Sequence, residues 1–396
     1  MPAQTADLVI VNTCGFIDAA KEESIEAVLW AADEAHSRGA RVAAVGCLVE
    51  RYRAQLAAEL PEIDVLCGFE QGPLLAALAV AAAGRGEVGV EETTAPRRRL
   101  ARPLHAYVKI SDGCDRRCAF CAIPLIKGRY ETVPPERVLA DARAGLESGA
   151  RELVLVGQDT SRWAVDGYGA LPQLLTDLAA LQPLWLRLLY LQPDGVDGPL
   201  LEALAHYAVP YADIPLQHAS GRVLRRMGRR GDDESYLALL ARVRDAVPGV
   251  ALRSTFITGF PGETEEDVEI LVDFIEAAQL ALAGVFVFDP QQGTRAAALR
   301  PRVPAAEAEE RAARVVEAIE RAASSYWSTQ IGTTVDVLVE QGSRSPGRDA
   351  VGRIALQAPD VDGLTYLAGT GPLRRGQAVR AVIETAAGYD LTARAV

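Results

Sequence analysis

The sequence lacks any apolar run that could cross a membrane. A membrane-spanning helix needs ~20 consecutive apolar residues, whereas the longest run here, Leu74 to Ala83, has ten and is typical of an Ala-rich helix. The first residues carry no basic stretch followed by an apolar leader segment. We therefore expect no membrane span, and we expect a cytoplasmic protein.

Cysteine and basic residues are also in short supply. Six cysteines are spread over 396 residues, which excludes a disulfide-stapled mini-protein and favours reduced thiols. Lys and Arg total 41 against 53 Asp and Glu, so the net charge is −12. Proteins that coat nucleic acid usually present a basic face, so the charge favours a basic protein partner or a small molecule. An apolar fraction of 49% excludes a mainly disordered chain.

Residues 1–85 alternate short apolar runs with stretches of helical periodicity. Helices are expected to begin near Asp18 and Tyr52. This βαβαβα order predicts an α/β domain with a doubly wound parallel sheet. Residues 86–103 are rich in glycine and arginine and have the composition of a linker. The strand candidates are Leu8–Val11, Val42–Val45 and Ile63–Leu66.

Residues 104–328 repeat a strand–helix unit six times and end in a long charged helix near Ala305–Ser325. Six units predict a partial (β/α)6 barrel, short of the eight that close a full barrel. The strand candidates are Ala106–Ile110, Glu152–Val156, Trp185–Leu191, Tyr211–Leu216, Leu252–Ile257 and Ala283–Phe288.

Residues 331–396 change to a period of two. Val335, Val337 and Val339 alternate with polar residues, and further strand candidates follow at Thr365–Leu367, Ala378–Ile383 and Tyr389–Ala393. This pattern predicts a small antiparallel β-barrel. Seven acidic residues offset seven arginines here, so the predicted barrel is electrically neutral.

Three cysteines with the spacing C-x3-C-x2-C follow the first strand of the predicted barrel. They are Cys114, Cys118 and Cys121. Thiolates on one loop favour zinc or an iron–sulfur cluster. Structural zinc needs a fourth ligand, and the nearby candidate, His105, lies on the other side of the strand. A four-iron cluster held by three cysteines instead leaves one iron open to a substrate. Three unrelated buried cysteines are the alternative.

The other cysteines are Cys14, Cys47 and Cys67. Cys14 and Cys47 each follow a predicted parallel strand, and open α/β sheets bind ligands at this edge. The two thiols are therefore candidates for a second metal centre, and buried cysteines without ligands are the alternative. Cys67 follows the third strand.

These motifs together resemble one known family. The C-x3-C-x2-C spacing is the signature of radical S-adenosylmethionine enzymes. The stretches Val11–Ile17, Val45–Cys47, Pro215–Ser220 and Arg253–Asp267 resemble the methylthiotransferases, and most nearly the ribosomal-protein aspartate methylthiotransferases (RimO type). The C-terminal barrel is similar to the TRAM domain. The resemblance covers nearly the whole chain.

The resemblance implies two [4Fe-4S] clusters. Cys114, Cys118 and Cys121 would hold the cluster that binds S-adenosylmethionine, and Cys14 and Cys47 would hold an auxiliary cluster that carries sulfur. An electron donor would reduce the first cluster. The implied product is an aspartate of the twelfth small-subunit ribosomal protein, methylthiolated at its β-carbon. The S-adenosylmethionine pocket would draw on the barrel's functional face, where Gln158, Gln217, His218, Gly259 and Glu263 follow predicted strands.

One departure from the family pattern concerns the first domain. The family has three N-terminal cluster cysteines, whereas only Cys14 and Cys47 match here, and Cys67 stands at no family ligand position. We expect that about one βα unit, on the order of 30–40 residues, is missing before Leu8. The third ligand of the auxiliary cluster is then not identified.

Other functions compete with this interpretation. The related MiaB-type enzymes modify a tRNA adenosine, but a basic C-terminal barrel is expected for RNA affinity, and this one is neutral. tRNA is therefore not the expected substrate. A truncated chain would instead cleave S-adenosylmethionine without transferring sulfur, or bind the ribosome without chemistry.

Overall fold

The computed structural model describes residues 6–70, 72, 74, 76, 78, 103–342, 350–368 and 372–396. The linker expected at 86–103 lies outside these residues except for Pro103, and the run from Leu74 to Ala83 is described at only three positions. By its internal contacts the chain forms two compact units. The first combines the residues up to 95 with Gly113–Arg129 and Asp289–Ala298, and the second contains the remainder.

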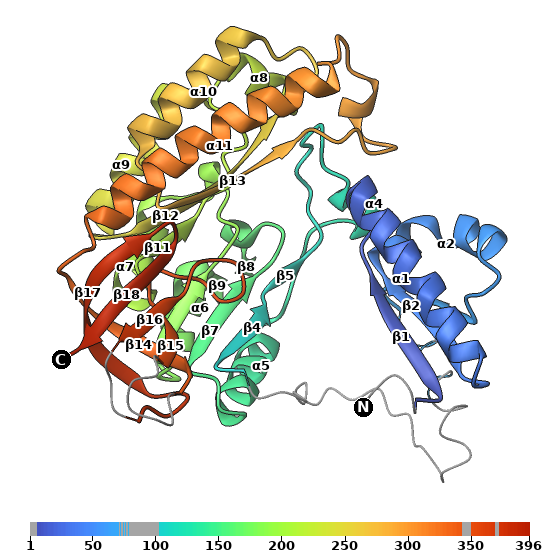
Figure 1. Ribbon diagram of the computed structural model, residues 1–396, viewed down its shortest axis with the longest axis horizontal. Coiled ribbons are helices and arrows are strands. Elements are labelled where there is room, and N and C mark those ends of the chain that lie inside the picture. Colours follow the sequence, from blue (N-terminus) through green and yellow to red (C-terminus); the bar gives the residue numbers. More distant parts are fainter. Residues whose placement is uncertain are drawn as a thin grey trace. The chain divides into compact units, whose positions relative to one another are not determined.

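The first unit is built on a parallel sheet with the strand order β1-β2-β3 (Figure 1). Its strands are β1 (Leu8–Thr13), β2 (Arg41–Gly46) and β3 (Val65–Cys67). Helices α1 (Asp18–His36) and α2 (Cys47–Glu59) connect them. The parallel α/β class predicted from the alternating pattern is confirmed. Parallel pairing places the carboxyl ends of all three strands at one edge of the sheet.

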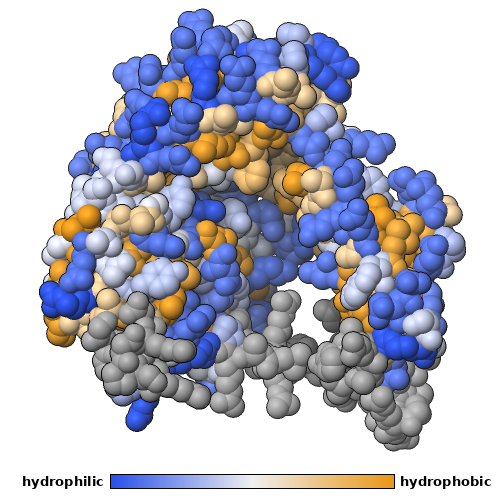
Figure 2. Space-filling view, in the orientation of Figure 1, coloured by the Kyte–Doolittle hydropathy of each residue, from blue (hydrophilic) through white to orange (hydrophobic). Residues whose placement is uncertain are grey.

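Helices α1 and α2 pack on a shared apolar cluster. Val28 of α1 and Leu48 and Leu56 of α2 are buried together with Ala44 of β2. Hydrophilic and hydrophobic side chains both reach the surface of this unit (Figure 2), where Trp30 of α1 is 66% exposed. Helix α2 begins at Cys47, five residues before the predicted start, and is kinked at Tyr52.

The second unit contains six parallel strands in chain order, as predicted. They form two three-stranded sheets, β10-β7-β4 and β11-β12-β13. The Leu191 N–H donates to the Asp213 carbonyl across the junction at 2.9 Å, which continues the partial barrel. The strands are β4 (His105–Lys109), β7 (Glu152–Val156), β10 (Trp185–Leu188), β11 (Tyr211–Asp213), β12 (Ala251–Thr258) and β13 (Leu282–Val287). Short strand pairs are β5 (Ser111–Asp112) with β6 (Glu131–Thr132) and β8 (Ala164–Val165) with β9 (Gly169–Ala170).

Helices follow the strands of this unit, and their start signals lie in the sequence. Thr264 and Asp267 form a reciprocal capping box at the start of α10, which satisfies backbone N–H groups that the helix leaves without partners. The helices are α5 (Pro135–Glu147), α6 (Leu171–Ala179), α7 (Gly198–Tyr207), α8 (Gly221–Met227), α9 (Asp233–Ala246), α10 (Glu265–Ala278) and α11 (Ala305–Ser328). In the part of the chain that is described, no helix combines the length and apolarity needed to cross a bilayer.

The C-terminal residues form a closed five-stranded barrel in the order β14-β15-β16-β18-β17. Four strand pairings are antiparallel, and the pairing of β16 with β18 is parallel. The second strand, β15, does not appear among the strands predicted from the sequence. The strands are β14 (Thr334–Gln341), β15 (Ala350–Ile354), β16 (Thr365–Ala368), β17 (Ala378–Ala387) and β18 (Asp390–Ala395).

One apolar cluster joins this C-terminal barrel to the partial barrel. It includes Trp185 of β10, Val337 of β14 and Trp327 of α11. The Trp327 indole N–H donates to the carbonyl of Ala281 at 2.9 Å, so the ring is anchored as well as buried. The two barrels of the second unit therefore share a core.

Candidate functional site

The loop that carries three cysteines belongs to the first unit. Cys114 is buried, and Cys118 and Cys121 are partly exposed. The backbone N–H of Arg116 donates to the Cys114 sulfur at 3.4 Å, and that of Ile123 donates to the Cys121 sulfur at the same distance. Backbone donors of this kind stabilise the thiolate form and tune the potential of an iron–sulfur cluster.

A glycine and a carbonyl close this loop upon itself. The Cys114 N–H donates to the Gly128 carbonyl at 3.3 Å. Gly113 has φ +67°, and a Cβ there would stand 2.0 Å from the Arg129 carbonyl oxygen. Only glycine allows this conformation and this close approach. The sequence Gly113-Cys114 therefore fixes where the first sulfur is presented.

The loop offers three thiol donors, which is the number that a four-iron cluster with one open iron needs and one fewer than structural zinc needs. Each cysteine of a cluster binds a different iron, so the sulfurs stand farther apart than around a single ion. Within the described ranges, no three His, Cys, Asp or Glu side chains form a site for one metal ion. His105, the candidate fourth zinc ligand, instead pairs with Asp360 at 3.2 Å.

The remaining cysteines stand at the carboxyl edge of the first unit's sheet. Cys14 directly follows β1, Cys47 begins α2 after β2, and Cys67 is the last residue of β3. Cys14 is exposed and Cys47 is partly exposed, whereas Cys67 is buried and its sulfur bonds to the Glu70 carbonyl. The predicted placement of Cys14 and Cys47 at one sheet edge is confirmed. A role of either as a ligand stays a prediction.

Gln158 and Gln217 lie at the carboxyl ends of strands in the second unit, as predicted. Gln158 follows β7, and its side-chain oxygen is buried without a hydrogen-bond partner. Gln217 follows β11 in the left-handed region, with φ +75°. Its backbone is held on both sides, because its N–H donates to Thr255 and its carbonyl accepts from Ile257, each at 2.8 Å. Strain of this kind persists only where the surroundings fix it, and it is common at ligand sites.

His218 follows Gln217, is fully buried, and accepts hydrogen bonds from the backbone of its own loop. Its Nδ1 accepts the N–H groups of Ala219 and Ser220, each at 2.9 Å. Because Nδ1 is the acceptor in this network, we assign the proton to Nε2. Nε2 faces the Glu263 carboxylate at 3.4 Å. The imidazole of the loop after β11 therefore lies against the carboxylate of the loop after β12, and neither His218 Nε2 nor Glu263 Oε2 has a hydrogen-bond partner among the described residues.

Glu263 is also fully buried, and it organises the loop after β12. Its Oε1 accepts the Gly259 N–H at 3.0 Å and the Arg311 Nη1 at 3.0 Å. A Cβ at Gly259, which has φ +70°, would stand 2.5 Å from the Cβ of Ala308. This glycine is thus required by packing against α11, in addition to any approach to a ligand.

Arg311 is not among the site residues predicted from the sequence. This arginine of α11 is 4% exposed and forms a buried ion pair with Glu263. No local motif indicates it, because the two residues are 48 positions apart. A buried carboxylate requires a paired cation, so Glu263 on a buried loop could have signalled a missing partner but not which one.

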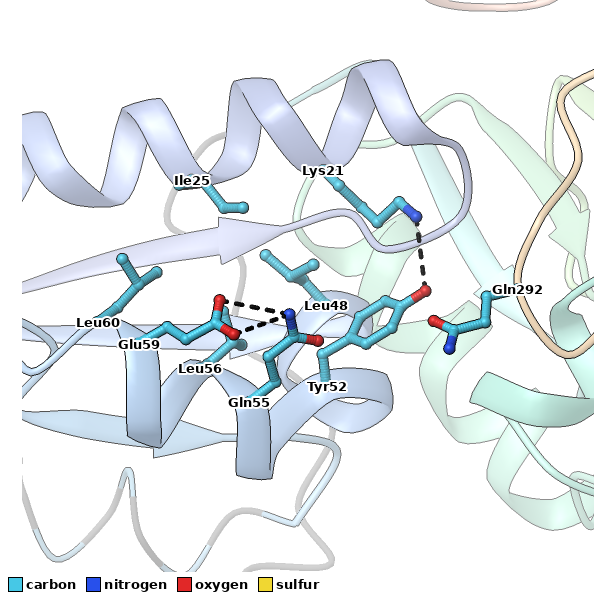
Figure 3. A pocket seen from close by; sticks show the side chains of 9 residues that line it. All are labelled: Lys21, Ile25, Leu48, Tyr52, Gln55, Leu56, Glu59, Leu60 and Gln292. Carbon is cyan, nitrogen blue, oxygen red and sulfur yellow. Dashed lines mark hydrogen bonds between the residues drawn. The ribbon is translucent and has the colours of Figure 1, made fainter.

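A pocket of about 370 Å³ lies between α1 and α2 in the first unit (Figure 3). The Lys21 ammonium points toward the Tyr52 hydroxyl at one end of the pocket, and Gln55 bonds to Glu59 farther along. None of the predicted site residues lines it. The lining residues are Lys21, Ile25, Leu48, Tyr52, Gln55, Leu56, Glu59, Leu60 and Gln292.

Family models match three stretches of the chain. Residues 2–68 match the Uncharacterized protein family UPF0004, residues 108–275 match the Radical SAM superfamily, and residues 331–396 match the TRAM domain. The central match contains Cys114, Cys118 and Cys121. The first match contains Cys14 and Cys47.

Curated relatives align over almost the whole chain. A protein of Nocardioides sp. named ribosomal protein uS12 methylthiotransferase RimO is 41% identical, over 99% of this chain and 90% of the relative. A protein of the same name from Desulforudis audaxviator is 42% identical, over 98% of this chain and 89% of the relative.

A solved structure resembles the chain in its fold. The radical S-adenosylmethionine methyltransferase TsrM from Kitasatospora setae, with cobalamin and a [4Fe-4S] cluster bound, aligns with a TM-score of 0.54. The two are 16% identical, and the match covers 72% of this chain and 64% of TsrM. At this identity the likeness supports the fold alone.

Proposed function

The chain belongs to the family of ribosomal protein uS12 methylthiotransferases named RimO, and from this premise we propose that it transfers a methylthio group to the β-carbon of an aspartate in uS12. The observation that carries the proposal is the loop of Cys114, Cys118 and Cys121, where backbone N–H groups already point at two sulfurs. The chain is accordingly a transferase. The names of the relatives favour a protein substrate over a tRNA adenosine.

We propose that these three cysteines hold a [4Fe-4S] cluster and leave its fourth iron to S-adenosylmethionine. Once bound and reduced by an electron donor, such a cluster would supply the electron for cleaving S-adenosylmethionine into methionine and a 5′-deoxyadenosyl radical. The protein binds the cofactor, excludes water and places the substrate C–H bond beside the radical.

We propose that five residues of the second unit build the S-adenosylmethionine pocket. They are Gln158, Gln217, His218, Gly259 and Glu263. The orphaned Gln158 oxygen and the fixed backbone of Gln217 offer polar groups to a ligand. Because His218 and Glu263 are fully buried, we assign them to holding the two loops in place. Gly259 presents its backbone next to them.

We further propose that Cys14 and Cys47 hold an auxiliary [4Fe-4S] cluster that carries the sulfur to be methylated. This assignment is supported by the position of both cysteines at the carboxyl ends of adjacent parallel strands. Cys67 is buried, and its sulfur is engaged with Glu70, so we do not include it as a ligand. The third ligand is not among the residues we assign.

We assign a role to each of the predicted domains. We propose an N-terminal methylthiotransferase domain at 1–85, a linker at 86–103, a radical core at 104–328 and a TRAM domain at 331–396. The net charge of −12 and the neutral C-terminal barrel favour a basic protein partner over tRNA. An enzyme that acts on uS12 or on the assembling small subunit would work in the cytoplasm.

Product analysis tests the proposal. The anaerobically reconstituted protein is incubated with S-adenosylmethionine, a chemical reductant, and equal amounts of uS12 and bulk tRNA. We expect methylthio-aspartate in uS12 and unmodified adenosine in tRNA. Methylthio-adenosine would overturn the substrate assignment, and 5′-deoxyadenosine without either product would favour a chain that cleaves S-adenosylmethionine without transferring sulfur.

A further inference from the structure

A ten-residue segment of the first unit contacts both cysteine-bearing parts of that unit. Residues Asp289–Ala298 follow β13 in the chain but pack within the first unit. The Asp289 carboxylate accepts the Asp18 N–H, at the start of α1, at 2.8 Å. At the segment's other end, the Ala296 N–H donates to the Ala119 carbonyl at 2.8 Å. Ala119 lies between Cys118 and Cys121.

A second contact fixes the same end of the segment. The Arg295 guanidinium donates to the Arg117 carbonyl at 3.1 Å, so two bonds hold the backbone on either side of Cys118. A Cβ at Gly293 would stand 3.0 Å from the side chain of Leu125, which shows how closely the segment approaches α4 (Ile123–Ile126). The segment therefore bears directly on the loop of the radical cluster.

Arg51 ties the other end of the segment to the N-terminal cysteines. It lies one turn after Cys47 in α2, and its Nη1 donates to the Gly15 carbonyl, next to Cys14, at 2.9 Å. The same guanidinium donates to the Gln291 side chain at 3.1 Å and to the Gln292 carbonyl at 2.5 Å. One planar cation thus joins the two strand ends that carry Cys14 and Cys47 to the bridging segment.

Gln291 completes the connection. It is 3% exposed, and while its oxygen accepts from Arg51, its amide nitrogen donates to Asp289 at 2.6 Å. Both ends of the amide are therefore used, as a buried polar side chain requires. Gln292 contributes only its backbone carbonyl to this network, and its side chain faces the pocket between α1 and α2 (Figure 3).

We propose that Arg51 and Gln291 are positioning residues that fix the separation between the auxiliary cluster site at Cys14 and Cys47 and the radical cluster site at Cys114, Cys118 and Cys121. This inference rests on the proposed function of both cysteine sets. Sulfur must reach the substrate carbon where the radical is formed, and a displacement of ~1 Å costs on the order of 100-fold in rate. The bridge sets that distance through the protein chain.

The first test measures the protein without clusters. Hydrogen exchange of the Asp18 and Ala296 amides is compared in Arg51→Ala, Gln291→Ala and the unchanged protein. We expect exchange at both amides to rise about tenfold in each variant, because one anchor of the bridge is lost. Arg53→Ala and Gln292→Ala are matched controls, since Arg53 bonds to Leu66 and Glu70 instead of the bridge. Unchanged exchange at Ala296 in Arg51→Ala would overturn the proposal.

The second test measures the reconstituted protein. Pulsed electron paramagnetic resonance gives the coupling between the two reduced clusters, and product analysis gives methylthio-aspartate formed per 5′-deoxyadenosine. We expect Arg51→Ala to broaden the distribution of couplings between the two clusters. We also expect it to lower the methylthio-aspartate formed per 5′-deoxyadenosine about tenfold. Arg51→Lys should give intermediate values of both. An unchanged coupling and ratio would contradict the proposal. If the unchanged protein holds only one cluster, the proposed function fails, and the exchange experiment still decides whether the bridge exists.

Discussion

Arg353 of β15 donates a hydrogen bond to the Glu152 carboxylate of β7 at 2.9 Å, across 201 residues of sequence. Arg187 of β10 donates to the other oxygen of the same carboxylate at 2.7 Å. All three side chains are buried. The C-terminal barrel is therefore joined to the partial barrel by a buried ionic cluster inside a shared apolar core, and we expect the two to unfold together.

Glu152→Gln removes the carboxylate charge that Arg187 and Arg353 share. Arg187 then loses its buried carboxylate partner, whereas Arg353 keeps Glu340. Breaking a buried ion pair costs about 3–5 kcal/mol of the free energy of unfolding. Glu384→Gln is the matched control, because Glu384 pairs with Arg394 on the surface, where a pair contributes about 0–1 kcal/mol. Urea unfolding followed by circular dichroism measures both. Equal losses in the two variants would show that the buried cluster does not stabilise the joint.

The substitution Asp267→Asn tests the capping box of α10, because the contribution of the Asp267 carboxylate to the free energy of unfolding depends on pH. Burial alone would raise the pKa of the Asp267 carboxyl, but hydrogen bonds from Ser220, Thr264 and Arg222 outweigh it and lower the pKa below the usual 3.8. A depressed pKa stabilises the fold above pH 3.8, and this contribution is lost as the pH falls through the folded-state value.

We therefore expect Asp267→Asn to destabilise the protein by about 1–2 kcal/mol at neutral pH. The difference from the unchanged protein should stay constant down to about pH 5 and shrink below about pH 4. Unfolding by urea at a series of pH values measures it. A difference that persists undiminished at pH 3 would contradict the assigned cause.

Arg311→Met tests whether α11 supports the S-adenosylmethionine pocket. The substitution leaves the Glu263 carboxylate buried without its cation, so the loop holding Gly259 loses its anchor. We expect the dissociation constant for S-adenosylmethionine, measured by equilibrium dialysis, to rise about tenfold. Arg314→Met is the control on the same helix, because Arg314 pairs with the exposed Glu265. Equal affinities in both variants would remove Arg311 from the pocket's support.

Iron content tests the assignment of the cysteines. We expect about eight irons per chain in the reconstituted protein and about four after Cys114→Ala or after Cys14→Ala. Cys67→Ala should leave the iron content unchanged, because Cys67 is not assigned as a ligand. Iron and sulfide analysis of anaerobically prepared samples measures this. A loss of iron in Cys67→Ala would make Cys67 a ligand of the auxiliary cluster.

The elements that repeat a strand and a helix could be predicted from the sequence. All six strands of the partial barrel occur where predicted, and α10 spans Glu265–Ala278 as its caps indicate. Strand β15 could not be predicted, because Gly352 interrupts its apolar pattern. A Cβ at Gly352 would stand 2.3 Å from the Leu338 carbonyl oxygen, so packing within the closed barrel selects the glycine that local propensity disfavours.

The candidate site could likewise be predicted from the sequence only in part. The spacing of Cys114, Cys118 and Cys121 is local, so their shared loop could be predicted. Arg311 instead contacts Glu263, which is 48 positions away in the sequence, and Arg51 contacts Gln291, which is 240 positions away. No periodicity encodes such pairs, because they depend on how separate elements pack.

We propose above that Cys114, Cys118 and Cys121 hold a four-iron cluster with one iron open to S-adenosylmethionine. The most direct measurement is the electron paramagnetic resonance spectrum of the reduced Cys14→Ala/Cys47→Ala protein, which isolates this cluster, recorded before and after S-adenosylmethionine is added. We expect a four-iron signal that shifts when S-adenosylmethionine binds. A signal that does not respond, or a protein that binds zinc and no iron, would contradict it.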